Sequence, residues 1–339
     1  MLIAGIASGV AGARHFFTGA PGREQAGVAD VKEGELFVRY AGNPILTATN
    51  WPYTVNAVFN PAVTRYAGET LLLVRVEDRT GLSHLCVARS ADGLTNWVIE
   101  PDRRLLPDLA DPAEIYGIED PRITLCGDEY MIAYTGYSRS GPLVCLAATR
   151  DFRTFERRGV VMPPEDKDAA LFPCQFDGRW ALIHRPVSTT PAVSAHIWLS
   201  WSPDLRHWGG HTLLLEAREG AWWDAHKVGL NAPPLATPHG WLILYHGVRV
   251  TAAGSIYRLG LALLDTAQPD RVIARSDEWL FGPQAPYERM GDVGDVVFPC
   301  GWLLDDDGDT LRVYYGAADT SVCVATASLI RLLATLGRP

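Results

Sequence analysis

Polar and charged residues recur where apolar runs of this sequence end, and their types could do chemistry. The set comprises Asn60, Arg75, Glu77, Asp78, Glu119, Asp120, His184, Arg185, His246 and Asp319. Several of these residues directly follow apolar runs, where a purely structural charge would need a paired partner. Carboxyl, guanidinium and imidazole groups that meet in one cleft can transfer protons and bind anions.

Taken one at a time, these residues carry little information. Asp120 precedes a proline, and Asp-Pro commonly starts a turn, so the dipeptide alone does not indicate catalysis. Arg75 could be a structural partner of Glu77 or Asp78. A single histidine such as His246 is more often a satisfied core residue than a functional one. A shared position in a repeated element is what would bring such groups together.

The charges of the set, with nearby lysines, divide into two groups. The acidic group is Glu77, Asp78, Glu119 and Asp120, and the basic group is drawn from Lys167, Arg185, Lys227 and His246. Ordinary glycoside hydrolysis uses two carboxyl groups. Cationic groups near a cleft favour an anionic ligand, and the planar guanidinium suits phosphate. If phosphate itself attacked an anomeric carbon, one carboxylic acid would suffice, so the two groups together favour phosphorolysis.

A fivefold repeat supplies the elements that would position these residues. Five dipeptides ending in proline each precede an apolar strand: Asn60-Pro61, Asp120-Pro121, Phe172-Pro173, Ala232-Pro233 and Phe298-Pro299. These prolines are 52 to 66 residues apart, which fits a four-stranded antiparallel blade with its loops. Helical periodicity is confined to residues 329–336. The pattern predicts an all-β, five-bladed β-propeller with a short C-terminal helix.

The strand around residues 36–40 is in a position to complete the last blade and close the ring, which would remove an open sheet edge. No linker divides the chain, so we expect a single domain over residues 31–339, preceded by an N-terminal extension over residues 1–30. A β-sandwich with accidental regularity is the alternative fold. In a propeller, equivalent positions of the blades face one axial pocket.

Composition limits the classes of function. The chain has 339 residues, of which 47% are hydrophobic, so a large folded core is expected. A formal net charge of −9 argues against a nucleic-acid partner. The six cysteines lack metal-binding spacing and are expected to be buried thiols, so we expect no metal site. No apolar run reaches about 18 residues and the N-terminal stretch lacks a basic start, so we expect a cytoplasmic protein outside the membrane.

From about residue 42 to residue 319 the chain resembles glycoside hydrolase family 130, the β-mannoside phosphorylases and related mannosidases. The resemblance is carried by Asn60-Pro61-Ala62-Val63, Val74-Arg75-Val76-Glu77-Asp78, Gly117-Ile118-Glu119-Asp120-Pro121-Arg122, Leu171-Phe172-Pro173, His184-Arg185-Pro186, Tyr245-His246-Gly247-Val248 and Tyr314-Tyr315-Gly316-Ala317-Ala318-Asp319. It implies a five-bladed propeller and an inverting reaction without metal or organic cofactor. Inorganic phosphate would be the co-substrate, and a β-manno-oligosaccharide would yield α-mannose 1-phosphate.

The resemblance also implies roles for individual residues. The general acid would be Asp120, acting through a hydroxyl of the bound mannose. The substrate-binding residues would be Asn60, Arg75, Glu77, Glu119 and Asp319. The phosphate-binding residues would be Lys167, Arg185 and Lys227, with His246 beside them. Lys167 stands where relatives often carry arginine.

An acid must carry its proton when the glycosidic bond breaks. Nearby Glu119 or buried surroundings would raise the pKa of Asp120, whereas Arg122 would oppose that increase. The outcome depends on how these groups lie in the fold.

Three alternatives are open at the level of sequence. A hydrolase of the same fold would use a water molecule and a carboxylate base, either Glu77 or Asp78. A furanosidase-like propeller would divide the work among three acidic residues, and a non-catalytic sugar-binding propeller would use aromatic side chains and need no acid. Residues 74–81 look more like the β-1,2 than the β-1,4 enzymes, but the sequence fixes neither the linkage nor whether the chain forms a homo-oligomer.

Overall fold

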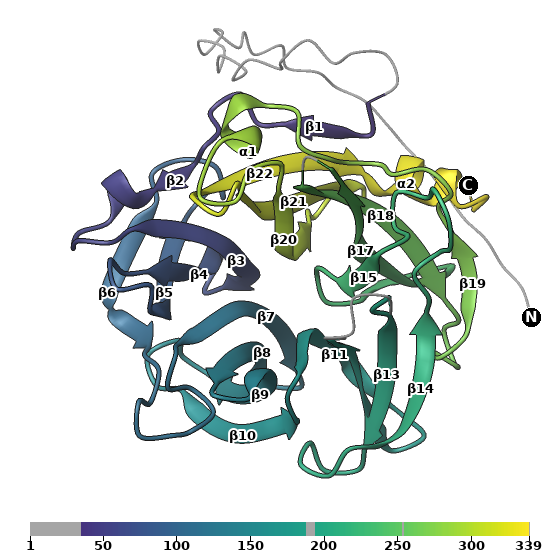
Figure 1. Cartoon of the computed structure of the whole chain (residues 1–339), viewed down its shortest axis with the longest axis horizontal. Helices are drawn as coiled ribbons and strands as arrows, with labels where there is room; N and C mark the ends of the chain where they lie inside the picture. Colours follow the sequence, from purple (N-terminus) through teal and green to yellow (C-terminus); the bar gives the residue numbers. More distant parts are fainter. Residues whose placement is uncertain (1–34, 188–193, 253, 339) are drawn as a thin grey trace, which may run out of the picture.

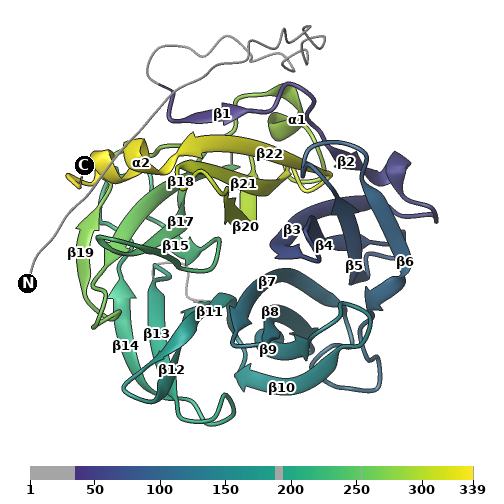
Figure 2. The same ribbon diagram turned by 180° about the vertical axis from the view of Figure 1, so that it is seen from behind.

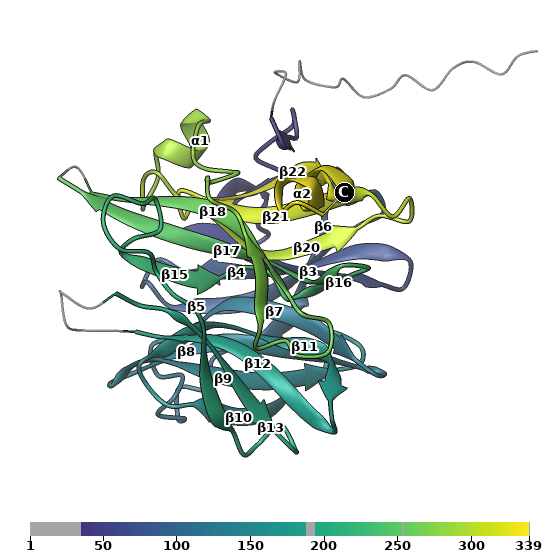
Figure 3. The same ribbon diagram turned by 90° about the vertical axis from the view of Figure 1, so that its right-hand side faces the viewer.

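The fold is a ring of five antiparallel sheets around a central axis, seen in a computed structural model of the chain (Figure 1). The structure describes residues 35–187, 194–252 and 254–338. The N-terminal extension expected over residues 1–30 lies outside these ranges. Figure 2 shows the same ring from behind, and Figure 3 shows it from the side. The predicted all-β, five-bladed β-propeller is confirmed.

Blades 1 to 3 have four strands each, and the chain passes from the axis outward in each of them. Blade 1 consists of β3 (Ala57–Tyr66), β4 (Glu69–Glu77), β5 (Ser83–Ser90) and β6 (Val98–Leu105). Blade 2 consists of β7 (Ile118–Cys126), β8 (Glu129–Ser138), β9 (Gly141–Thr149) and β10 (Glu156–Met162). Blade 3 consists of β11 (Asp166–Phe176), β12 (Arg179–Pro186), β13 (Ile197–Ser202) and β14 (Gly209–Leu215).

Blades 4 and 5 contain short extra strands. Blade 4 consists of β15 (Lys227–Leu230), β16 (Leu235–Thr237), β17 (Gly240–Thr251), β18 (Gly254–Leu264) and β19 (Val272–Arg275). Blade 5 consists of β20 (Val297–Leu304), β21 (Thr310–Ala317) and β22 (Ser321–Ser328), joined by β1 (Phe37–Arg39) and β2 (Leu46–Thr47). The helical segments are η1 (Ala48–Asn50), α1 (Pro286–Arg289) and α2 (Leu329–Thr335), of which α2 is the expected C-terminal helix. Within the described ranges no helix has the length and apolar character to cross a membrane.

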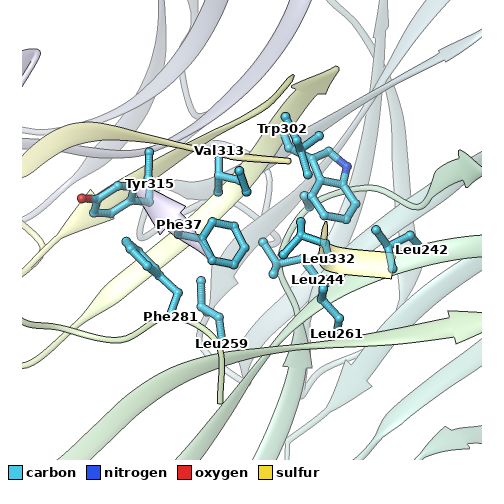
Figure 4. Packing of buried hydrophobic residues seen from close by; sticks show 14 of the residues in the cluster. Phe37, Leu242, Leu244, Leu259, Leu261, Phe281, Trp302, Val313, Tyr315 and Leu332 are labelled. Atoms are coloured by element: carbon cyan, nitrogen blue, oxygen red, sulfur yellow. The ribbon is translucent and has the colours of Figure 1, made fainter. Parts of the chain in front are cut away.

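The first strand of the chain closes the ring. β1 pairs antiparallel with β22, and Phe37 lies opposite Ala327. The Phe37 side chain is only 2% exposed and packs between blades 4 and 5, with its ring 5.3 Å from that of Phe281 and close to Tyr315 (Figure 4). Because β1 and β22 come from opposite ends of the chain, their pairing removes an open sheet edge. Closure by residues 36–40, as predicted, is therefore confirmed.

Apolar runs form the middle strands because each blade is covered on both faces by its neighbours. In β4, the consecutive residues Leu71, Leu72, Leu73 and Val74 are all 0% exposed. A strand buried on both faces has no reason to alternate apolar and polar residues, so it reads as one continuous apolar run. All six cysteines are free thiols, as expected; five of them are buried, whereas Cys174 is partly exposed.

The innermost strands of blades 1 to 3 share a β-bulge near the axis, and each bulge contains a residue with a positive φ angle. Asn60, Asp120 and Asp168 have φ angles of 44°, 49° and 56°. Each lies within a shift of strand register, which spans residues 59–62 in β3, 119–122 in β7 and 167–170 in β11. Asn and Asp tolerate this left-handed backbone better than most residues, and such bulges commonly re-aim side chains beside active sites. Three blades therefore carry an Asn or Asp at the same axial position.

The proline alignment of the repeats needs a correction in blade 3. The prolines after Asn60 and Asp120 lie inside the innermost strands, not in loops that lead into them. In blade 3 the matching residue is Asp168, which is followed by alanine, whereas Phe172-Pro173 lies further along β11. The alignment fails there because the bulge depends on the backbone and not on a proline.

Candidate active site

A pocket of about 470 Å³ is formed at the axis by residues from all five blades. The resemblance assigns roles to ten residues, and the structure brings eight of them to the wall of this pocket: Asn60, Arg75, Asp120, Lys167, Arg185, Lys227, His246 and Asp319. The other two, Glu77 and Glu119, lie behind the wall and contact Arg75. The fold thus brings together in one pocket residues that are far apart in the sequence.

Arg75 on β4 organises the acidic side of this pocket. Its Nη1 donates to Asp120 Oδ1 at 3.1 Å, and its Nη2 donates to Glu119 Oε1 at 2.9 Å. Nη2 also lies 3.8 Å from Glu77 Oε2, and Nε donates to Ser83 Oγ at 3.0 Å. Burial disfavours its charge, but the surrounding carboxylates raise the pKa of Arg75 above its ordinary value, so it stays a cation.

Asp120 is buried, with 4% of its surface exposed. Its Oδ1 accepts hydrogen bonds from Asn60 Nδ2 at 2.9 Å and from Arg75. Burial alone would raise the pKa of Asp120, but the charges of Arg75, Arg122 and Lys167 outweigh it and lower the pKa. The increase considered from the sequence is therefore absent in the free pocket, and Arg122 opposes it as expected.

Asp319 is the carboxyl group that holds a proton near neutral pH. It occupies the turn after β21, with a φ of 54°. Burial and the negative charges of Asp120 and Glu119 raise the pKa of Asp319 to about 7, against the opposing charge of Arg75. The acidic side of the pocket thus contains one ionised aspartate, Asp120, and one readily protonated aspartate, Asp319.

Lys167, Arg185 and Lys227 form the basic side of the pocket. Lys167 on β11 lies directly opposite Arg185 on β12, and Lys227 begins β15 of the next blade. Lys227 Nζ donates to the hydroxyl of Tyr257 at 2.8 Å and lies 5.1 Å from the centre of its ring. Burial and the charges of Arg185 and Lys167 lower the pKa of Lys227 to about 8, against the opposing charge of Asp168.

Asp168 holds Arg185 in place, although the sequence reasoning did not single it out. Arg185 Nε and Nη2 each lie 2.7 Å from Asp168 Oδ2, and His246 Nε2 lies 3.6 Å from the same oxygen. Burial disfavours the charge of Asp168, but Arg185, His246 and Arg122 hold its pKa well below the ordinary value. Its position directly after Lys167, aligned with Asn60 and Asp120 in the bulge, was the signal that could have found it.

His184 and His246, the two histidines singled out in the sequence, have different surroundings. Burial, with the charges of Arg185 and Lys227, lowers the pKa of His246 to about 3 although Asp168 opposes this, so His246 is neutral near pH 7. His246 therefore adds no positive charge to the basic group near pH 7. The ring of His184 is bonded within blade 3, to Asp166 Oδ2 at 2.6 Å and to a serine hydroxyl.

Asp78 does not reach the pocket. Its Oδ1 accepts hydrogen bonds from the backbone N–H groups of Thr80 and Leu82 at 2.7 and 3.0 Å, so it stabilises its own turn. Further pocket residues that sequence reasoning missed are Tyr137, Glu165, Asp168, His226, Tyr257 and Phe298. Across the described ranges, no group of three or more His, Cys, Asp or Glu side chains is arranged to hold a metal ion.

Comparisons with known proteins show what this chain is similar to. The family model described as β-1,4-mannooligosaccharide phosphorylase, glycoside hydrolase family 130, matches residues 36–338. A β-1,2-mannobiose phosphorylase of Listeria innocua is 32% identical, over 87% of this chain and 97% of that protein. A β-1,4-mannooligosaccharide phosphorylase of Ruminococcus albus is 33% identical, over 88% of this chain and 89% of that protein. The crystal structure of the Listeria innocua β-1,2-mannobiose phosphorylase with β-1,2-mannobiose covers 89% of this chain and 99% of its own, with a TM-score of 0.81 and 32% identity.

Proposed function

The chain belongs to glycoside hydrolase family 130, and we propose that it catalyses the inverting phosphorolysis of β-mannosides to α-mannose 1-phosphate. Asp120 is the general acid and inorganic phosphate is the nucleophile. The observation that carries the proposal is the division of one pocket into a carboxyl side around Arg75 and a cationic side around Arg185. No organic cofactor is required, because phosphate is itself the second substrate.

On the carboxyl side, the terminal mannose of the substrate contacts Asn60, Arg75 and Asp319. These side chains offer amide, guanidinium and carboxyl groups, and sugar hydroxyls can both donate to and accept from such groups. Glu77 and Glu119 act one layer further out, because both contact Arg75 and fix its orientation. Their contribution is to hold the sugar-binding arginine, which supports the wider substrate-binding set.

The proton comes from the coupled pair Asp120 and Asp319. With the pKa of Asp120 lowered and that of Asp319 raised to about 7, the free pocket carries its proton on Asp319. Two interacting carboxyl groups titrate as a pair, so a bound sugar that weakens the Asp120–Arg75 contact shifts the proton toward Asp120. Asp120 then donates it, through a mannose hydroxyl, to the leaving oxygen.

Phosphate lies against Lys167, Arg185 and Lys227 and attacks the anomeric carbon from the face opposite the leaving group. The reverse reaction builds β-mannosides. A hydrolase would need a carboxylate base for water. Of the two candidates, Asp78 is bonded within its own turn and Glu77 is paired with Arg75. This supports phosphate over water as the nucleophile.

The test is to incubate the protein with β-1,2-mannobiose and with β-1,4-mannobiose, each with and without phosphate. The proposal expects mannose 1-phosphate only when phosphate is present. Which disaccharide reacts identifies the linkage, and the resemblance of residues 74–81 favours β-1,2. Free mannose formed equally fast without phosphate would indicate a hydrolase, and sugar binding without turnover would indicate a non-catalytic propeller.

A further inference from the structure

A buried carboxylate stands in the middle of the cationic side of the pocket. Asp168 is 1% exposed and lines the pocket together with Lys167, Arg185 and Lys227. Its two oxygens are not equivalent. Oδ2 receives Arg185, whereas Oδ1 has no hydrogen-bond partner within the described residues, and Arg122 Nη2 lies 3.5 Å from it. A buried acceptor without a hydrogen bond is costly unless a ligand or water satisfies it.

An ionised carboxylate at this place disfavours most anions. The neighbouring cations keep the pKa of Asp168 below its ordinary value, so it remains negatively charged. It therefore repels any oxyanion that offers only lone pairs. Hydrogen phosphate is different, because it carries a P–OH group that can donate a hydrogen bond to a carboxylate. Sulfate has the same shape but carries no proton at neutral pH.

We propose that Asp168 accepts a hydrogen bond from the P–OH group of hydrogen phosphate and thereby makes the pocket select phosphate over sulfate. This inference rests on the proposed function, because it assumes that the cationic side binds phosphate. Arg185 and the lysines supply attraction for any oxyanion, and Asp168 supplies the discrimination between protonated and unprotonated ones. The principle is general: a site built to bond a substrate OH rejects an analogue that lacks it.

The backbone conformation at this position does not itself require a carboxylate. Blade 1 has the neutral Asn60 at the same bulged position with nearly the same left-handed backbone, so the fold accepts an amide. The Oδ2 side is closely packed, since a side chain at Gly229 would approach Asp168 Oδ2 to 2.6 Å. Oδ1 is buried, pairs with Arg122 Nη2 at 3.5 Å and has no hydrogen bond within the described residues, so it is the oxygen with spare acceptor capacity.

The experiment compares phosphate and sulfate in the wild type and in Asp168→Asn. We expect sulfate to inhibit the wild type at concentrations at least about tenfold above the phosphate KM, since a hydrogen bond to a charged group supplies that much discrimination. Asp168→Asn should raise the phosphate KM, lower the sulfate inhibition constant, and reduce the phosphate-to-sulfate selectivity by about 10- to 100-fold. Unchanged selectivity in a folded Asp168→Asn protein would overturn the proposal.

Lys227→Met is the matched control. It removes a point charge from the same side without touching the bonds of Asp168 to Arg185. A point charge does not distinguish the two anions, so both should bind more weakly and their ratio should stay as in the wild type. If Asp168 acted only by holding Arg185, then Asp168→Asn would also weaken both anions in parallel, and the proposal would fail.

The wild type alone provides a second test that does not depend on the folding of a variant. Arsenate carries an As–OH group, whereas monofluorophosphate is a phosphate dianion with fluorine in place of the hydroxyl. Arsenate should compete with phosphate at concentrations near the phosphate KM, and monofluorophosphate should inhibit as weakly as sulfate. Tight binding of sulfate or monofluorophosphate by a phosphate-dependent enzyme would overturn only the role of Asp168. Turnover that ignores phosphate would instead overturn the proposed function.

Discussion

Blades 1 and 3 place an arginine at the same point of the sheet, but the two arginines have different surroundings. Arg75 on β4 pairs with Phe59, and Arg185 on β12 pairs with Lys167, each just before the bulge of the innermost strand. Within the described residues, the Arg75 guanidinium has three carboxylates within 4 Å, whereas the Arg185 guanidinium pairs with Asp168 and lies beside Lys167.

The difference comes from the residue that the neighbouring innermost strand contributes. Beside Arg75, blade 2 supplies Glu119 and Asp120. Beside Arg185, blade 4 supplies Lys227, whose pKa the charge of Arg185 helps to lower. One repeated scaffold thus builds a side suited to proton transfer and sugar hydroxyls, and a side suited to an anion. A difference in charge at a few equivalent positions distinguishes the two sides of the pocket.

Removing the general acid on the carboxyl side of the pocket should give the largest effect on the catalytic rate. Asp120→Asn keeps the shape and the hydrogen bond from Asn60 but cannot supply a proton. We expect kcat to fall about 1,000-fold in both directions at saturating substrates, the middle of the range for loss of a general acid. Asp78→Asn is the matched control, because Asp78 lies in a turn outside the pocket, and it should stay close to the wild-type rate. Near-normal turnover by Asp120→Asn would remove Asp120 from the mechanism.

Arg185→Gln should act on the other side of the comparison. We expect the phosphate KM to rise about 100-fold, because a charge-assisted contact with phosphate is lost, while the mannoside KM stays nearly constant. Initial rates with each substrate varied in turn measure the two constants. The melting temperature should be measured as well, because the variant removes the arginine that balances the buried negative charge of Asp168. An increase confined to the mannoside KM would contradict the division of the pocket.

The pH dependence of phosphate binding should sharpen the comparison. Burial and the nearby cations lower the pKa of Lys227 to about 8, so its charge is present below pH 8 and lost above it. Phosphate is mainly a dianion over this range, so the loss of the Lys227 charge should dominate and raise the phosphate KM about tenfold between pH 7.5 and 9.5. Lys227→Arg should abolish the step, because arginine remains charged. A step of equal size in the arginine variant would assign it to another group.

The smallest effect should come from the crowding of carboxyl groups on the acidic side. Burial and Asp120 raise the pKa of Asp319 from 3.8 to about 7, so protonation of Asp319 stabilises the fold at low pH, and this stability is lost as pH rises from about 4 to about 7. Asp319→Asn lacks this loss. The melting temperature of the variant relative to the wild type should therefore increase by about 2 to 4 °C between pH 5 and pH 8. A melting-temperature difference between variant and wild type that does not change with pH would show that Asp319 is not the carboxyl group with the raised pKa.

The fold could be read from the sequence because its repeat leaves regular marks. Apolar strands recur at the spacing of the blades, and the strand at residues 36–40 pairs with β22 at the other end of the chain. Part of the pocket followed from the same reasoning, since Asn60, Asp120 and Arg75 stand at repeated positions. The blades and the equivalent positions within them depend on the order and spacing of strands, which the sequence shows directly.

Other features of the site depend on three-dimensional surroundings that no spacing records. Asp168 was missed because the bulge in β11 lacks the proline that marks Asp120. The ionisation of Asp120, Asp319 and His246 reflects the balance between burial and charges that come from several blades. That balance places the proton on Asp319 in the free pocket, which sequence reasoning could not foresee.

The central claim is that phosphate, not water, attacks opposite Asp120. The most direct measurement is to run the reaction in ¹⁸O-labelled water with unlabelled phosphate and to analyse the product by mass spectrometry and ³¹P NMR. The account predicts α-mannose 1-phosphate with no ¹⁸O at the anomeric carbon. Free mannose that carries ¹⁸O at that carbon, formed at a rate independent of phosphate, would contradict it.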